Sequence, residues 1–304
     1  MARVFVTHEI AGEALGRLRA AHDVKVWPGE LQPSAEELRA AVADVEGLLC
    51  MLTDTIDLSL IAAAPRLRAI ANYAVGFDNI DLASARARGI AVGNTPDVLT
   101  DATADLAFAL LLASARRLVE AERAVRNGAW QTWEPTRWNG ASVYGATLGI
   151  VGFGRIGQAV ARRAEGFAMT VLATPATPLD ELLERSDFVS LHCPLTEQTW
   201  HLIDETALRR MKPSAIIINT ARGAIIDQQA LAAALRDHAI AGAALDVTDP
   251  EPPPHDDPLF DAPNVTLLPH IGSATHSARS QMTELAVANL LAGLDGQPMP
   301  HPAT

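Results

Sequence analysis

The sequence predicts an α/β protein built from two doubly wound parallel sheets. Three observations lead to this prediction. Short runs of Val, Ile, Leu and Ala alternate with amphipathic stretches along the chain, as expected for strands covered by helices on both faces. One of these runs leads directly into a glycine-rich turn that opens a helix. The length of 304 residues favours two domains over one.

The first hundred residues contain four short apolar runs that predict buried strands. An amphipathic stretch from Ala11 predicts a helix after the first of them. The four runs cover residues 3–7, 47–51, 67–72 and 90–94.

The middle of the chain predicts a long helix followed by a long loop. Periodic apolar residues run from Thr100 to Asn127, where Gly128 is a stop signal, and this is the longest helical stretch. Residues 129–145 hold three of the five tryptophans together with Pro135, Gly140 and Gly145, which indicates a connection without regular structure.

A second α/β series then begins. Helices are predicted from Arg155, from Asp227 and from about Thr275 to Leu294. The strands are predicted at residues 147–152, 169–173, 187–193, 215–220, 240–247 and 265–269.

The turn after the first strand of this series has the spacing of a dinucleotide-binding fingerprint. Gly152 permits a tight turn, Gly154 lets the backbone approach a pyrophosphate, and Gly157 lets the helix lie close to the strand. Arg155 and Ile156 lie at the helix start, where free N–H groups attract phosphate. The turn therefore predicts a Rossmann-like domain that binds NAD or NADP. The alternative is that the glycines only close a strand-to-helix turn.

The acidic residue that such folds place about 20 residues further on, at the adenosine ribose, is missing. The second strand ends in Thr174-Pro175, so Thr174 takes that place. The first carboxylate is Asp180, which we expect to cap the following helix. The sequence therefore does not select between NAD and NADP, and we expect weak discrimination between them.

Three further residues, Arg222, Glu251 and His270, each follow a predicted strand, where open parallel sheets bind ligands. An arginine holds a carboxylate or carbonyl with two hydrogen bonds and stays charged. A histidine is a proton donor near neutral pH, and a neighbouring carboxylate orients it and favours its protonated form. Together they predict a hydride-transfer site. Singly, the arginine could cap a helix and the glutamate could lie on a solvated rim.

Charge and composition argue against several classes of function. Lys and Arg number 24 and Asp and Glu 36, a net charge of −12 that opposes binding to nucleic acid. No apolar run is long enough for a membrane span, and no metal site is expected. Two cysteines, Cys50 and Cys193, form no disulfide or zinc pattern and favour a reducing, cytoplasmic location.

The chain resembles the D-isomer-specific 2-hydroxyacid dehydrogenases, and within them the glyoxylate/hydroxypyruvate reductases. The resemblance extends over nearly the whole length and combines the glycine fingerprint with all three candidate catalytic groups in order. It rests on residues 47–57, 72–81, 92–113, 148–163, 186–196, 218–227, 244–254 and 267–275.

The resemblance implies a role for each site residue. Arg222 binds the carboxylate and carbonyl of a small 2-oxo acid, and His270, paired with Glu251, donates the proton. The N–H groups of Val75 and Gly76 hold the carboxylate, and Leu52 lines the substrate pocket. The residues implied at the NAD(P) cofactor, besides the glycine turn and Thr174, are Thr103, His192, Cys193, Pro194, Thr220, Ala221, Asp246, His270 and Gly272.

Three of these residues have a purely structural alternative. Thr103 could serve as a helix-start hydroxyl, His192 as a satisfied core histidine and Asp246 as a turn cap.

The resemblance also implies the domain organisation. Residues 1–97 with 274–304 form the substrate-binding domain, and residues 98–273 form the dinucleotide-binding domain. The helix at 101–127 is expected to bridge the domains and to form a homodimer interface. The alternative is that its apolar face packs within one subunit.

The chain departs from the family pattern at two places. One β-α unit of the family pattern is missing after residues 174–178, so the cofactor sheet is expected to lack an edge strand. The tryptophan that reaches the neighbouring subunit's site in these reductases has no clear counterpart, and Trp138 is only a weak candidate.

Related proteins with other functions are less favoured. Dinucleotide-sensing corepressors carry extra tails, and phosphoglycerate dehydrogenases usually carry a regulatory domain, although short forms exist. Formate dehydrogenases of the family pair their histidine with glutamine, whereas Glu251 stands here.

Overall fold

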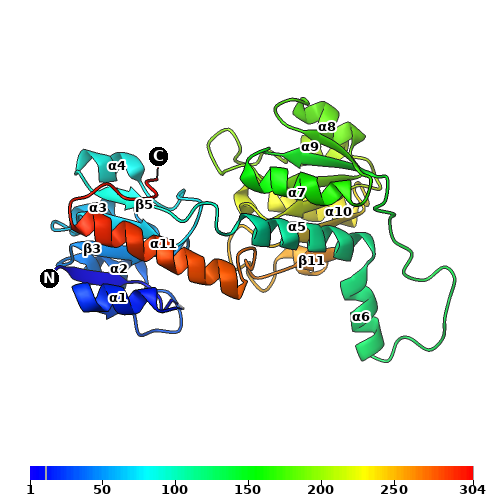
Figure 1. Ribbon diagram of the computed structural model, residues 1–304. Helices are drawn as coiled ribbons and strands as arrows, with labels where there is room; N and C mark the ends of the chain where they lie inside the picture. The colour runs from blue at the N-terminus through cyan, green and yellow to red at the C-terminus, as the bar shows by residue number, and fades with distance from the viewer. Residues whose placement is uncertain (11, 304) are drawn as a thin grey trace. The chain divides into compact units, whose positions relative to one another are not determined.

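The computed structural model describes residues 1–10 and 12–303, which form two compact units (Figure 1). Unit 1 comprises Met1–Leu99 with Ala274–Thr304, and unit 2 comprises Thr100–Ser273. The sequence places the first boundary after residue 97, two residues earlier than the division after Leu99, and the second after residue 273.

Unit 1 contains a five-stranded parallel sheet with the order β2-β1-β3-β4-β5. The second strand was not predicted, because its sequence DVKV alternates and lies half exposed at the sheet edge. The strands are β1 Arg3–Val6, β2 Asp23–Val26, β3 Gly47–Cys50, β4 Ala69–Asn72 and β5 Ala91–Gly93.

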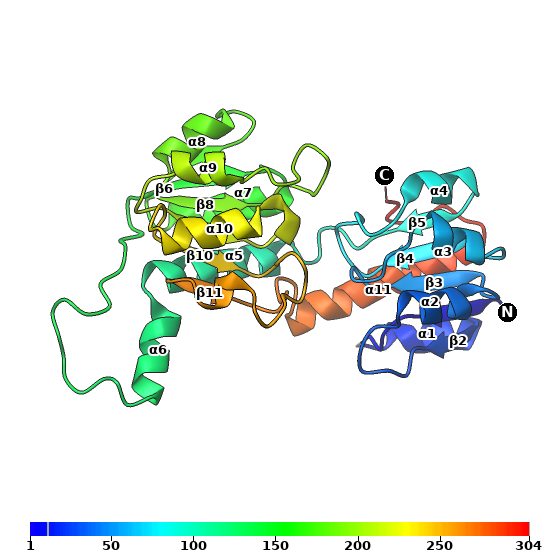
Figure 2. The same cartoon turned by 180° about the vertical axis from the view of Figure 1, so that it is seen from behind.

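Helices cover both faces of this sheet (Figure 2). One face carries α1 (Ala14–Ala21) and α11 (His276–Leu294), and the other carries α2 (Ala35–Val42), α3 (Leu58–Ala63) and α4 (Leu82–Ala87). The predicted start of the first helix, Ala11, lies outside the described residues. The last helix was predicted within one residue, because the Thr275 side chain accepts a hydrogen bond from the Ala278 N–H and caps it.

Unit 2 contains a six-stranded parallel sheet with the order β11-β10-β9-β8-β6-β7. After β7 the chain crosses back over the sheet, and β8 pairs with β6 on the side opposite β7. β7 therefore forms the edge of the sheet. This agrees with the expected loss of one β-α unit. The strands are β6 Thr147–Val151, β7 Thr170–Ala173, β8 Phe188–Leu191, β9 Ile216–Asn219, β10 Gly242–Leu245 and β11 Val265–Leu267.

The faces of this sheet are covered by α5 (Thr100–Ala115) and α7 (Arg155–Glu165) on one side. On the other side lie α8 (Leu179–Arg185), α9 (Glu205–Arg210) and α10 (Gln228–Arg236).

The expectation that Asp180 caps α8 is wrong. Pro178 occupies the cap position, and Asp180 lies in the first turn, where the helix dipole favours its charge. Its carboxylate lies 3.3 Å from the Arg210 guanidinium.

The single helix predicted from Thr100 to Asn127 is also wrong. The structure has two helices, α5 and α6 (Leu118–Arg126), separated by Arg117 with φ of 52°. The Ala141 N–H donates to the Ala115 carbonyl at 2.8 Å, so the returning loop takes the place of the next helical turn. Figure 1 shows α6 and the following loop extending away from the sheet.

Neither unit contains a helix that could cross a membrane: within residues 1–10 and 12–303, every helix is too short or too polar. Cys50 and Cys193 are buried free thiols.

Candidate active site

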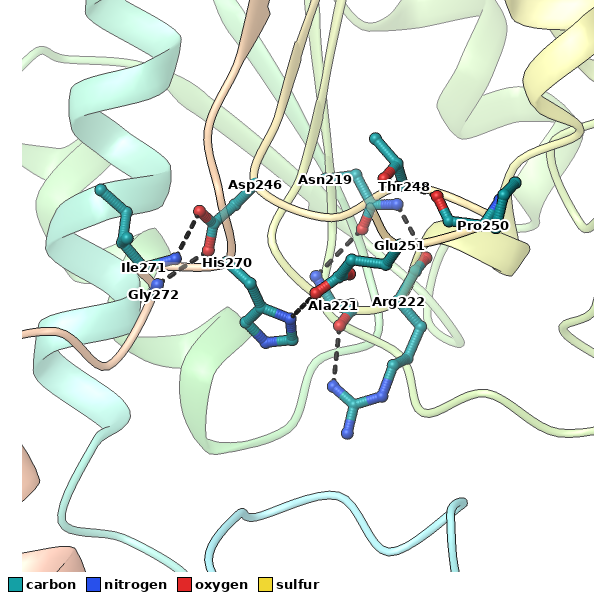
Figure 3. A network of polar contacts seen from close by, with 10 residues as sticks. All are labelled: Asn219, Ala221, Arg222, Asp246, Thr248, Pro250, Glu251, His270, Ile271 and Gly272. Carbon is teal, nitrogen blue, oxygen red and sulfur yellow. Dashed lines mark hydrogen bonds and ion pairs between the residues drawn. The ribbon is translucent and has the colours of Figure 1, made fainter. Parts of the chain in front are cut away.

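The candidate catalytic residues lie at one edge of the unit 2 sheet. Arg222 follows β9, Glu251 follows β10, and His270 follows β11. Because these strands are neighbours and parallel, their carboxyl ends bring the three loops together (Figure 3). The three side chains extend to the same side of the loops that carry them.

His270 and Glu251 form a hydrogen-bonded pair, with 2.7 Å between Nδ1 of the imidazole and Oε1 of the carboxylate. Since an ionised carboxylate only accepts, Nδ1–H is the donor, and Nε2 is left for another partner. The histidine backbone is fixed as well, because its N–H donates to the Asp246 carbonyl at 2.9 Å. The His270 side chain is 21% exposed, so solvent and ligand can reach it.

The loop that carries Arg222 is held by a fully buried asparagine. Asn219 donates from Nδ2 to the Arg222 carbonyl at 2.8 Å and accepts at Oδ1 from the Ala221 N–H at 3.0 Å. The Arg222 guanidinium donates to the Ala221 carbonyl at 2.9 Å. We did not predict Asn219, although a polar residue ending a fully apolar strand was the available signal.

The loop that carries Arg222 (the arginine loop) and the loop that carries Glu251 (the glutamate loop) are in contact through their backbones. A Cβ added at Gly223 would lie 2.0 Å from the Thr248 carbonyl oxygen, a distance that no side chain permits. The absence of a side chain at Gly223 therefore sets the separation of the two loops.

A buried glutamine of α10 holds both ends of the glutamate loop. Gln228 accepts at Oε1 from the Asp249 N–H at 2.9 Å and donates from Nε2 to Asp257 at 2.7 Å. Sequence reasoning missed Gln228, because nothing local distinguishes it from an ordinary helix residue.

The residues expected beside the nicotinamide lie together. A Cβ at Gly272 would lie 3.2 Å from the Asp246 carboxylate and 3.6 Å from the Thr103 hydroxyl. Asp246 accepts from the Ile271 and Gly272 N–H groups, each at 2.7 Å, and so caps this turn. Burial raises the pKa of Asp246. Each carboxylate oxygen keeps a lone pair for a further donor.

The glycine turn has the shape that a pyrophosphate requires. A Cβ at Gly152 would lie 2.4 Å from the Cys193 nitrogen, and one at Gly157 would lie 2.3 Å from the Gly152 carbonyl. A Cβ at Gly154 would have no neighbouring atom within 4 Å, so the backbone is open on that side. Gly154 is the cap residue of α7 and provides no side-chain cap, while Arg155 and Ile156 form the first turn.

The residues expected at the adenosine lie at the carboxyl ends of β7 and β8. The Thr174 hydroxyl accepts from the Gly152 N–H at 2.9 Å and thus ties the glycine turn to the edge strand. His192 is hydrogen-bonded to the Ser190 hydroxyl at 2.8 Å, and burial lowers its pKa to about 4, so its ring is neutral. Burial raises the pKa of Cys193 to about 11, and the next residue, Pro194, is exposed.

One buried hydroxyl of this region is left for a hydrogen bond to a ligand. The Thr220 hydroxyl, next to Ala221 at the end of β9, is buried without a hydrogen-bond partner among the described residues. Together with the open backbone at Gly154, it shows that these residues fit a bound dinucleotide. No cluster of three or more metal-ligating side chains occurs within residues 1–10 and 12–303.

Three of the four remaining predicted residues belong to unit 1, and the fourth, Trp138, belongs to unit 2. Leu52 follows β3, and Val75 and Gly76 follow β4, so all three lie at the carboxyl edge of that sheet. All three are half-buried. Trp138, the weak candidate, lies in the loop between α6 and β6, where the Arg137 guanidinium stacks 4.4 Å from its ring.

Comparison with known proteins agrees with this geometry. Residues 108–272 match the family model described as D-isomer specific 2-hydroxyacid dehydrogenase, NAD binding domain. A glyoxylate reductase of Korarchaeum cryptofilum is 51% identical over 98% of this chain and 95% of its own length. One of Thermococcus onnurineus is 49% identical, covering 98% and 94%.

Solved structures are similar over the full length. A Thermus thermophilus protein superposes with a TM-score of 0.93 at 48% identity, covering 99% of this chain and all of its own. A Sinorhizobium meliloti NADPH-dependent glyoxylate/hydroxypyruvate reductase, in complex with NADP and malonate, has a TM-score of 0.86 at 34% identity, covering 100% and 97%.

The two parallel sheets and the glycine turn define an NAD(P)-dependent oxidoreductase. More particularly, the chain belongs to the D-isomer specific 2-hydroxyacid dehydrogenase family. It is an NAD(P)-dependent enzyme that reduces 2-oxo acids to 2-hydroxy acids, with the reduced cofactor as hydride donor.

Proposed function

We propose that the physiological substrates are glyoxylate and hydroxypyruvate. The observation that carries this proposal is the His270–Glu251 pair at 2.7 Å, formed between the loops after β11 and β10, with Arg222 on the loop after the next strand, β9. A proton donor and a cation at the same edge of the sheet suit a small 2-oxo acid, whose carboxylate needs a counter-ion and whose carbonyl oxygen needs a proton. Relatives of about half identity over nearly the whole chain carry the name glyoxylate reductase.

The catalytic roles follow from the hydrogen bonds. The Arg222 guanidinium binds the carboxylate and polarises the carbonyl of the substrate. His270 holds a proton at Nε2 and gives it to the carbonyl oxygen as that oxygen gains negative charge. Glu251 accepts from Nδ1–H, which fixes the orientation of the ring. A bound reduced nicotinamide supplies the hydride.

The cofactor is held by unit 2. We assign the pyrophosphate to the backbone of the glycine turn and the first turn of α7. The Thr220 hydroxyl and Ala221 lie beside the nicotinamide ribose. Thr103, Asp246 and Gly272 lie at the nicotinamide itself. The segment His192–Pro194 and Thr174 border the adenosine.

Unit 1 is the substrate-binding domain in this proposal. Leu52 lines the pocket, and the N–H groups of Val75 and Gly76 bind the substrate carboxylate. The support is their position at the carboxyl edge of a parallel sheet.

We further propose a cytoplasmic homodimer. α6 buries none of its residues, yet Leu118 and Val125 on it and Trp130 and Trp133 beyond it are exposed apolar side chains. Such a surface is typical of a subunit interface. Two free buried cysteines agree with a reducing compartment.

The experiment that tests the substrate assignment is a comparison of initial rates. The purified enzyme is assayed with NADH and with NADPH against glyoxylate, hydroxypyruvate, pyruvate and phosphohydroxypyruvate. We expect the highest kcat/KM for glyoxylate or hydroxypyruvate. A clear preference for either of the other two acids would contradict the assignment.

A further inference from the structure

Three consecutive peptide carbonyls after β4 are each held by a donor from unit 1. The Ala74 carbonyl accepts from the Thr95 N–H at 2.8 Å. The Val75 carbonyl accepts from Asn94 Nδ2 at 2.7 Å, and the Gly76 carbonyl accepts from Asn72 Nδ2 at 2.8 Å. The donors come from the ends of two neighbouring strands, β4 and β5.

A held carbonyl also fixes the N–H of the next residue, because the peptide unit is planar and the two groups point in opposite directions. Asn94 therefore sets the direction of the Gly76 N–H, and Asn72 sets that of Phe77. Among the described residues, the N–H groups of Val75, Gly76 and Phe77 have no protein acceptor. Successive free N–H groups of this kind form an anion-binding concavity.

The two asparagines are themselves rigidly placed. Asn72 is fully buried and also donates to Asn79 Oδ1 at 3.1 Å, and Asn79 donates to the Met51 and Asp54 carbonyls at 3.1 and 3.0 Å. The Asn94 carbonyl accepts from the buried amide of Asn289 at 2.8 Å. Buried polar groups in a satisfied network keep a single arrangement.

We propose that Asn94 and Asn72 are positioning residues for substrate: their side-chain amides aim the N–H groups of Gly76 and Phe77 at the substrate carboxylate. The inference rests on the proposed role of the Val75–Gly76 loop. It adds Phe77 as a third donor and names the side chains that create the site. Neither asparagine touches the reacting atoms.

The test uses neutral substitutions of similar volume, Asn94→Leu and Asn72→Leu, so that no new charge repels the substrate. We expect KM for glyoxylate to rise by about tenfold in each variant, the usual effect of one lost hydrogen bond to a charged group. We expect kcat and the Kd for NADPH to change by less than about twofold, because the proton donor and cofactor site lie in unit 2.

A matched control separates positioning from stability. Val42 is fully buried in α2 and takes no part in the hydrogen bonds that hold residues 72–79 and 94–95, so we expect Val42→Ala to lower the unfolding midpoint without redirecting the N–H groups. We expect unchanged KM in this control. If the asparagines were only structural, Asn94→Leu would also show a lower unfolding midpoint and an unchanged KM. An unchanged KM in a folded Asn94→Leu protein therefore overturns the proposal.

A direct measurement keeps the inference testable if one variant does not fold or if the substrate assignment fails. Addition of oxamate, an unreactive carboxylate, is expected to shift the amide proton resonances of Gly76 and Phe77 in the wild-type protein. The shift is expected to disappear in whichever variant folds. Wild-type resonances that do not respond to oxamate would contradict the inference, whereas absent turnover of 2-oxo acids with intact resonance shifts would contradict only the proposed function.

Discussion

Nδ1 of His270 lies 2.7 Å from Oε1 of Glu251, although 19 residues separate the two in sequence. The contact exists because β10 and β11 are adjacent parallel strands whose following loops meet at one edge. It leaves Nε2 of the imidazole as the group that can exchange a proton with substrate.

Replacement of His270 by Ala is expected to lower kcat for 2-oxo acid reduction by about 100-fold or more, the usual contribution of a general acid. The Kd for NADPH is expected to stay within about twofold, since binding does not need the proton. Steady-state kinetics and fluorescence titration measure both. His255 lies exposed on the same proline-rich loop as Glu251, and His255→Ala is the control. Near-normal turnover of His270→Ala would show that another group donates the proton.

Replacement of Glu251 by Gln removes the negative charge but keeps a hydrogen-bond acceptor. The hydrogen bond from His270 Nδ1–H to a charged carboxylate becomes one to a neutral amide and holds the ring less firmly, so kcat/KM for 2-oxo acid reduction is expected to fall by about tenfold. Steady-state kinetics of the two proteins measure this fall. Equal kcat/KM values would mean that the pair does not position His270.

The close contact between the arginine and glutamate loops predicts that a methyl group added at Gly223 lowers activity. Gly223→Ala places a Cβ 2.0 Å from the Thr248 carbonyl, so the two loops must separate and the catalytic side chains move with them. We expect kcat/KM to fall by about 100-fold, in line with the sensitivity of catalysis to small displacements. Gly166→Ala, whose Cβ meets nothing closer than 3.6 Å, is the control and is expected to be active. Equal activities of the two variants would show that the loop separation is unimportant.

The adenosine end predicts weak discrimination between NADH and NADPH, with a slight preference for NADPH. Thr174 stands where an acid would repel the 2'-phosphate, and its hydroxyl is engaged by the Gly152 N–H at 2.9 Å. The first carboxylate beyond it, Asp180, pairs with Arg210 and is not available. Titration of the apo protein with each cofactor measures the ratio, and a preference well above 100-fold would contradict this. Thr174→Asp is expected to favour NADH by about tenfold.

His192 predicts a loss of stability in mild acid. In the unfolded chain its imidazole gains a proton below about pH 6.5, whereas burial lowers the pKa in the folded protein to about 4. The folded-state pKa is depressed, so this contribution is present above pH 6.5 and is lost as the pH falls towards 4. Between about pH 7 and about pH 5 the loss amounts to about 2 kcal/mol.

Urea unfolding at both pH values measures this loss for the wild type and for His192→Gln, which keeps a partner for Ser190 but does not titrate. Between the two pH values, the free energy of unfolding of His192→Gln is expected to fall by about 2 kcal/mol less than that of the wild type. His255→Gln, at an exposed site, is expected to behave like the wild type. A wild-type loss equal to that of His192→Gln would contradict the assignment.

The sequence by itself determined the class of fold, the positions of most strands along the chain and the candidate catalytic residues. Strands buried on both faces are mostly apolar, so β3, β4, β8, β9 and β10 are visible without coordinates. Parallel strands put their carboxyl ends at one edge, so Arg222, Glu251 and His270 could be grouped from their positions after successive strands. The glycine turn is equally local, because its spacing is dictated by one strand, one turn and one helix.

Tertiary structure decided what depends on contacts between distant segments. The helix after Thr100 breaks because the Ala141 N–H binds the Ala115 carbonyl, and no local pattern contains that hydrogen bond. Gln228 holds the glutamate loop from another element, and Gly223 matters only because Thr248 lies against it. Periodicity and capping describe energies within one segment of chain. The positions of these loops come from hydrogen bonds and close approaches between segments, which exist only once the sheet has formed.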